Sequence, residues 1–123
     1  MSLLATLIAR EEGYYIAGSL PNRQNNPGDL RHSAHSLHDP SAPNAIGKID
    51  TPAHGWADLE RQLGLFAERG DTLAQAIGVY APPAENDTGA YLKFICDGLG
   101  VSVDAAQSLP MSAALQITGA QNA

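Results

Sequence analysis

One long segment that is poor in helix-forming sequence constrains this 123-residue chain more than any other feature. From Tyr14 to about Pro52 the sequence is rich in Gly, Pro, Asn, Ser and His, and it contains Pro21, Pro27, Pro40, Pro43 and Pro52. Because proline is excluded from the interior of an α-helix, we expect an irregular segment with room for one short hairpin. Connections longer than about 12 to 15 residues in compact domains are usually functional or disordered, so a binding surface is expected here.

Helical periodicity flanks this segment on both sides. The first helix is expected over about residues 3 to 12, with Ser2 as its N-cap and Gly13 as its stop. A second helix ends at Gly70 and carries apolar residues at helical spacing, namely Trp56, Leu59, Leu63 and Phe66. These patterns predict a mainly α fold.

Three further helices follow from capping and stop signals. Asp71 and Thr72 start one that Pro82-Pro83 closes. Asn86-Asp87-Thr88 caps the next, which Gly98 and Gly100 terminate, and a last short helix is expected around residues 111 to 117. We therefore expect a single domain over residues 1–123.

Composition narrows the function classes. Hydrophobic residues make up 44% of the chain and charged residues 16%, which is ordinary globular usage and predicts a folded chain. The net charge of −6, with seven Lys and Arg spread singly, argues against nucleic acid as a partner. No apolar run approaches the roughly 20 residues of a membrane span. Cys96 is the one cysteine, so no internal disulfide is expected and the thiol should be buried.

The first ten residues are apolar but lack the basic leading region of a signal peptide. We expect a protein that is made in the cytoplasm. If its target lies outside, another component must deliver it.

Two glutamates stand at the end of the first helix. At about 100° per residue, Glu11 and Glu12 both fall on its mainly apolar side. A carboxyl partly withdrawn from water has a raised pKa, which suits a general acid of the kind that glycosidases use. The alternative is a glutamate that pairs with Arg23 or Arg31, or one that is solvated at a frayed helix end. Periodicity does not choose between the two, and it points Glu11 somewhat nearer the centre of the apolar stripe.

Several segments in order resemble phage and prophage proteins of the lysozyme-like superfamily that are related to lytic transglycosylases. The resemblance covers roughly residues 3 to 102 and is carried by Glu12-Gly13-Tyr14-Tyr15, Asn25-Asn26-Pro27-Gly28-Asp29-Leu30-Arg31, Gly55-Trp56, Tyr80-Ala81-Pro82-Pro83-Ala84-Glu85-Asn86-Asp87-Thr88 and Tyr91. It implies a lysozyme-like helical domain that acts on bacterial peptidoglycan, with no cofactor and no metal.

The resemblance also assigns residues. It carries the catalytic role onto Glu12, which closes the first helix before a glycine, and it places Tyr80 against the glycan groove. The step from Thr88 to Tyr91 is similar to a Thr-x-x-Tyr motif that follows that groove, so Tyr91 is also expected to bind substrate. For both tyrosines the alternative is a half-buried core aromatic whose hydroxyl finds a partner.

The bond to be cleaved would be the β-1,4 link between N-acetylmuramic acid and N-acetylglucosamine. The turn at Asn25 and Asn26 offers amides that could hydrogen-bond sugar acetamides, or that simply hold the loop. This chain departs from the usual pattern at Asp29, where asparagine is common, and at Ile49 or Asp50, where an aromatic is common. These departures bear on how the substrate loop is arranged.

Hydrolases of this kind normally need a second carboxylate. The candidates are Asp29, Asp50, Glu85 and Asp87. Lytic transglycosylases need only one glutamate, acting as acid and then as base, while the substrate's own acetamide and 6-hydroxyl supply the nucleophiles. The closer resemblance to transglycosylases favours this single-glutamate mechanism. Delivery to the wall would then fall to a phage tail, a holin-type partner or a secretion system.

Two other functions compete with this one. His32, His35 and His38 stand at three-residue spacing beside Asp39, which is a ligand set that zinc accepts, although the segment lacks a His-Glu-x-x-His motif. The non-enzyme alternative is a lysozyme-fold structural or glycan-binding module of a virion or secretion machine. An open groove at Glu12 would favour the enzyme, whereas a filled one would favour the module.

Overall fold

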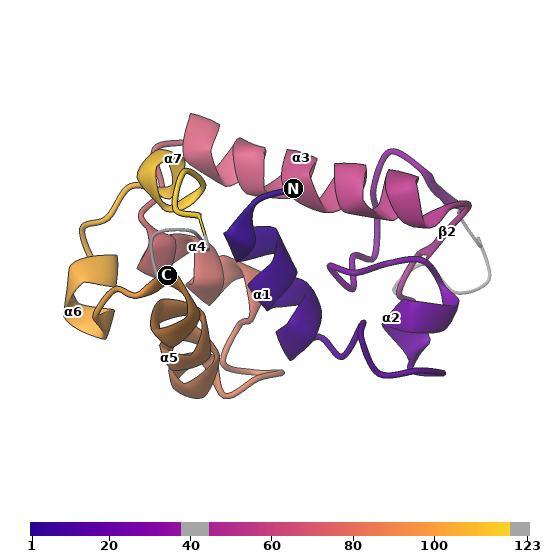
Figure 1. Cartoon of the computed structure of the whole chain (residues 1–123), viewed down its shortest axis with the longest axis horizontal. Helices are drawn as coiled ribbons and strands as arrows, with labels where there is room; N and C mark the ends of the chain where they lie inside the picture. The colour runs from indigo at the N-terminus through magenta and orange to yellow at the C-terminus, as the bar shows by residue number, and fades with distance from the viewer. Residues whose placement is uncertain (38–44, 119–123) are drawn as a thin grey trace.

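The computed structural model describes residues 1–37 and 45–118, and over these residues the chain is mainly helical, as predicted (Figure 1). Its elements in chain order are α1 (Leu3–Glu11), α2 (Leu20–Arg23), β1 (Ser36–Leu37), β2 (Lys48–Ile49), α3 (Pro52–Glu68), α4 (Leu73–Tyr80), α5 (Thr88–Leu99), α6 (Val103–Ala106) and α7 (Met111–Ala114). The long helix α3 runs along one edge of the molecule, with α1 beside it. Helices α4 to α7 gather toward one end of α3, and α2 with the strands lies toward the other.

The helix caps confirm the predicted starts. Ser2 accepts a hydrogen bond from the Ala5 amide at α1, and Thr72 forms a reciprocal capping box with Gln75 at α4. Asp87 caps α5 by accepting from the Ala90 amide. These bonds satisfy backbone donors that the first turn of a helix leaves without partners.

The irregular segment contains more structure than the prolines suggested. The expected hairpin is present as an antiparallel pair in which Ser36 faces Ile49 and Leu37 faces Lys48. The short helix α2 was not expected; Pro21 lies in its first turn, where the missing amide hydrogen is not needed. The same reason allows α3 to begin at Pro52.

The last part of the chain differs from prediction in three ways. Gly98 lies inside α5 rather than ending it, and Gly100, with a φ of 76°, forms the C-cap. The helix expected around residues 111 to 117 ends at Ala114, and α6 was not predicted. A methyl group on Gly98 would lie 2.5 Å from the Leu7 side chain, so this glycine is where α1 approaches α5. Tertiary packing, which local signals do not report, explains its position.

The core is built around α1. Its buried residues pack with apolar side chains of α3, α4 and α5, including Leu4, Ile8, Leu59, Leu63, Ile77 and Ile95. Cys96 is buried among them, as predicted. This packing fixes the end of α1 relative to α4 and α5.

The loop over residues 25–30 is fixed against α3. A methyl group on Gly55 would lie 1.9 Å from the Asn25 carbonyl oxygen, so only glycine lets the loop approach here. The Asn26 side chain is fully buried and donates to the carbonyls of Leu30 and Gly47, at 2.7 and 2.8 Å, while it accepts from the Leu30 amide. The loop is therefore held on both sides.

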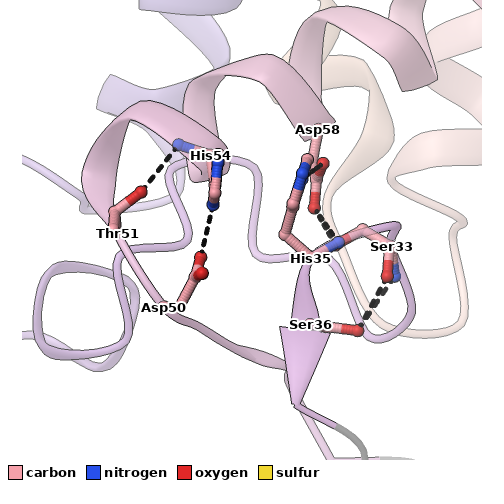
Figure 2. Close-up of polar contacts among 7 residues, drawn as sticks. All are labelled: Ser33, His35, Ser36, Asp50, Thr51, His54 and Asp58. Carbon is pink, nitrogen blue, oxygen red and sulfur yellow. Dashed lines mark hydrogen bonds and ion pairs between the residues drawn. The ribbon is translucent and has the colours of Figure 1, made fainter.

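A polar cluster attaches the segment before β1 to the start of α3 (Figure 2). Asp58 is 3% exposed and accepts from the Ser33 hydroxyl and from the His35 amide and ring. The His35 ring stacks on His54, with ring centroids 3.9 Å apart, and His54 pairs with Asp50 at 2.7 Å. This cluster gives the irregular segment a fixed position on α3.

No helix in the described part of the chain is both long and apolar enough to cross a bilayer.

Candidate active site

A cleft of about 510 Å³ opens between the end of α1, the loop that follows Pro27, and the segment after α4. Its volume lies within the range of roughly 300 to 1,000 Å³ that is typical of ligand pockets. The side chains and backbone that line it belong to Glu12, Gly28, Asp29, Leu30, Arg31, Ile46, Gln62, Phe66, Val79, Tyr80, Pro82, Glu85 and Asn86. Residues distant in the sequence thus meet at Glu12.

Glu12 is the C-cap of α1, and the chain turns away at Gly13, which has a φ of 86°. Its Oε2 accepts a hydrogen bond of 2.7 Å from the Tyr91 hydroxyl. Glu11 is exposed, so the periodicity that pointed it nearer the apolar stripe was misleading at this position. Leu7, Ile8 and Ala9 are buried in the core, whereas Glu11, the last residue of α1, is exposed.

The surroundings of Glu12 raise its pKa from 4.5 to about 7. Burial is the largest cause, because it penalises the charged carboxylate, and the hydrogen bond from Tyr91 acts against it. The charge of Asp29, a hydrogen bond with the Asp29 side chain and the charge of Glu11 each raise the pKa further. Glu12 therefore still holds its proton in a substantial fraction of molecules at neutral pH.

Asp29 reaches the cleft from the loop held on α3. Its φ of 52° is in the left-handed region, which aspartate tolerates better than most residues. Burial raises the pKa of Asp29, while the hydrogen bond with Glu12 and the charge of Arg31 lower it. Asp29 and Glu12 thus line the same cleft, and the charge of Asp29 raises the pKa of Glu12.

Tyr80 and Tyr91 each form a hydrogen bond that connects two segments of the site. The Tyr80 hydroxyl lines the cleft and donates to the Gly28 carbonyl, which ties α4 to the loop. Tyr91 is 3% exposed and lies behind Glu12, where its contact is with the carboxylate. Burial raises the pKa of both phenols, so they remain neutral hydrogen-bond donors.

The structure gives the two loop asparagines backbone partners. Asn25 donates to the Ile49 carbonyl at 3.0 Å, and Asn26 is fully buried with its amide engaged by the loop. Neither side chain lines the cleft. In this arrangement both shape the loop, as the Asx-turn alternative expected, and the predicted sugar contact would require Asn26 to leave its partners.

The other candidate carboxylates have separate roles. Glu85 lines the cleft and pairs with Arg31 at 3.3 Å, with both side chains about half exposed. Asp50 pairs with His54, and Asp87 caps α5. Of the four candidates only Asp29 and Glu85 line the cleft with Glu12.

The histidine spacing did not predict the observed partners. His35 lies beside His54 and Asp58 (Figure 2), whereas His38 and Asp39 fall outside the described residues. Within residues 1–37 and 45–118, no group of three or more His, Cys, Asp or Glu side chains could hold a metal ion.

Two cleft residues from α3 were missed as site residues. Phe66 was assigned to the apolar stripe, which is correct, but it also lines the cleft. Gln62 was not singled out. Gln62 could have been found from the sequence, because it stands between Leu59 and Phe66 on the inward side of α3. A polar residue at such a position must face either solvent or a cavity.

No known family model, no curated protein and no solved structure matches this chain.

Proposed function

We propose that this protein cleaves the glycan strands of peptidoglycan, with Glu12 as general acid and then general base, in a lysozyme-like domain. The observation that carries the proposal is a partly buried carboxyl with a pKa of about 7 that lines an open cleft. A carboxylic acid that retains its proton near neutral pH can protonate the leaving oxygen of a glycosidic bond. The segments that resemble lytic transglycosylases supply the substrate class.

The arrangement of carboxylates supports a single-glutamate mechanism. Retaining hydrolases hold two carboxyl groups about 5 to 5.5 Å apart, and inverting ones about 6.5 to 9.5 Å apart, because the sugar or a water must fit between them. Of the four candidates for a second carboxylate, Glu85 pairs with Arg31, and Asp50 and Asp87 do not line the cleft. Nucleophilic attack would then come from the substrate's acetamide or 6-hydroxyl, with the β-1,4 bond after N-acetylmuramic acid as the target.

The open cleft favours an enzyme over an inactive lysozyme-fold module. In an inactive module, side chains could fill the corresponding site. Here Glu12 lines an open cleft of about 510 Å³ together with residues of α3 and α4. We propose that the enzyme reaches the wall after delivery by a phage tail, a holin-type protein or a secretion system.

The test is digestion of purified peptidoglycan by wild type, Glu12→Gln and Glu11→Gln, with released muropeptides identified by mass spectrometry. We expect the wild type to release products ending in a 1,6-anhydro sugar and Glu12→Gln to release none. Glu11→Gln should retain activity because Glu11 is exposed at the helix end. Reducing ends would indicate a muramidase, and no release by wild type would favour the binding or structural module.

A further inference from the structure

Arg31 is the one cation among the described residues that line the cleft. The same lining holds three carboxyl groups, those of Glu12, Asp29 and Glu85. An anionic group that enters this cleft meets mainly negative charge, so Arg31 is the side chain that can hold it. We propose that Arg31 binds a carboxylate carried by the peptidoglycan strand, and that Glu85 occupies this position on Arg31 until substrate binds. This inference rests on the proposed function and names the part of the substrate that the cleft recognises.

The ion pair between Arg31 and Glu85 has the geometry of a contact that can be exchanged. Nη2 of Arg31 donates to Oε1 and Oε2 of Glu85, at 3.3 and 3.4 Å. Hydrogen bonds from a guanidinium to a carboxylate are usually about 2.7 to 2.9 Å long, and the strongest pairs use two nitrogens. The Arg31 side chain is 49% exposed and that of Glu85 is 55% exposed, so water screens their attraction. A second carboxylate can therefore displace Glu85 at little cost.

The backbone before Arg31 is fixed independently of Glu85. The Leu30 carbonyl accepts from the Asn26 side chain at 2.7 Å and from the Gly47 amide at 2.8 Å. The Leu30 amide donates to the Asn26 side chain at 2.9 Å. Arg31 thus stays beside the cleft when Glu85 is displaced, and little of its backbone has to be ordered when a ligand binds.

Peptidoglycan offers carboxylates that other N-acetylated glycans lack. The peptides attached to N-acetylmuramic acid carry free carboxylates, and where a peptide has been removed the lactyl group of the sugar ends in one. A planar guanidinium can bind such a group with two parallel hydrogen bonds, whereas only Nη2 of Arg31 contacts Glu85. Oligomers of N-acetylglucosamine are uncharged and give Arg31 no such partner. The site would therefore favour strands that contain N-acetylmuramic acid.

The experiment measures binding instead of cleavage, so every variant also carries Glu12→Gln. Dissociation constants are determined for soluble peptidoglycan fragments that retain their peptides and for uncharged N-acetylglucosamine oligomers. Arg31→Gln should weaken binding of the peptidoglycan fragments by roughly 3- to 10-fold, because a half-exposed charge-assisted contact is lost. Glu85→Gln should tighten it by about 2- to 5-fold, because the competing carboxylate is removed. Neither substitution should change binding of the uncharged oligomers.

Arg61→Gln and Glu11→Gln are the matched controls, because they make the same charge changes at exposed positions outside the cleft lining. Both should bind as the Glu12→Gln parent does. Unchanged affinity in Arg31→Gln would overturn the proposal. So would a change in the same direction for Arg31→Gln and Glu85→Gln, since that is the result expected of an ion pair that only supports the fold.

Two further comparisons complete the test. Fragments from which an amidase has removed the peptides identify the carboxylate: an effect of Arg31→Gln that persists assigns the lactyl group, and one that disappears assigns the peptide. If wild type releases no muropeptides but fragment binding depends on Arg31, the proposed cleavage fails and the carboxylate site stands. If wild type cleaves peptidoglycan while Arg31→Gln binds as its parent does, the cleavage stands and the carboxylate site fails.

Discussion

Replacing Glu12 by glutamine should stabilise the protein at alkaline pH and not at acidic pH. The folded-state pKa of Glu12, about 7, lies above its ordinary value of 4.5. Between these values the folded state binds more protons than the unfolded state, so wild-type stability falls as pH rises through this window. Glutamine does not ionise, and its side-chain oxygen can accept the hydrogen bond from the Tyr91 hydroxyl as Glu12 does.

The magnitude follows from the two pKa values. At about 1.4 kcal/mol per pKa unit, the difference between 4.5 and about 7 corresponds to roughly 3 kcal/mol in free energy of unfolding. Because the cleft is open to water, solvent screening reduces this, and we expect about 1 to 3 kcal/mol. The variant should gain this much relative to wild type between pH 4.5 and pH 8.

The assay is urea unfolding of both proteins across this pH range. With a slope of roughly 1 to 3 kcal/mol per molar urea, the expected gain moves the midpoint by about 1 M. Glu11→Gln serves as the control, since Glu11 is exposed and its removal should leave the pH dependence near that of wild type. A constant difference between Glu12→Gln and wild type from pH 4.5 to pH 8 would refute the claim that Glu12 is held protonated.

Three further predictions concern the groups around the site. Tyr91→Phe removes a hydrogen-bond donor that lowers the pKa of Glu12, so the alkaline limb of kcat/KM should move to higher pH. The free energy of unfolding at pH 8 should also fall by about 0.5 to 1.5 kcal/mol. An alkaline limb that did not move would contradict this prediction. Gly55→Ala should lower the free energy of unfolding by about 1 to 3 kcal/mol, because the added methyl group would meet the Asn25 carbonyl. Gly64→Ala on the same helix is the control, since its methyl group has open space and should raise the free energy of unfolding by up to about 1 kcal/mol. Thermal unfolding of both variants measures the difference. Asn26→Asp would place a carboxylate against two carbonyl oxygens, so stability should drop by about 2 kcal/mol or more; an increase in KM at unchanged stability would instead indicate a substrate contact.

The sequence by itself predicted α1, α3, α4, α5 and α7 and most of their ends, but not α2 or α6. The caps at Ser2, Thr72 and Asp87 lie within three residues of the amides they bind, so the information is local and can be read from the chain. The irregular segment could also be predicted, because each proline restricts the backbone at its own position and this effect can be read from the sequence. Its short helix α2 was missed, since proline is also compatible with a first helical turn.

Only the tertiary structure decided which residues form the site. Periodicity favoured Glu11 slightly over Glu12, yet the core ends before Glu11 and the cleft begins at Glu12. Asn26, for which a sugar contact and a loop-holding role were both open, is buried in the loop. Of the four candidates for a second carboxylate, only Asp29 and Glu85 line the cleft with Glu12. The pKa of Glu12 depends on burial and on a phenol and a carboxylate from distant parts of the chain. Such contacts arise when α1, α5 and the loop pack together, and no local pattern specifies them.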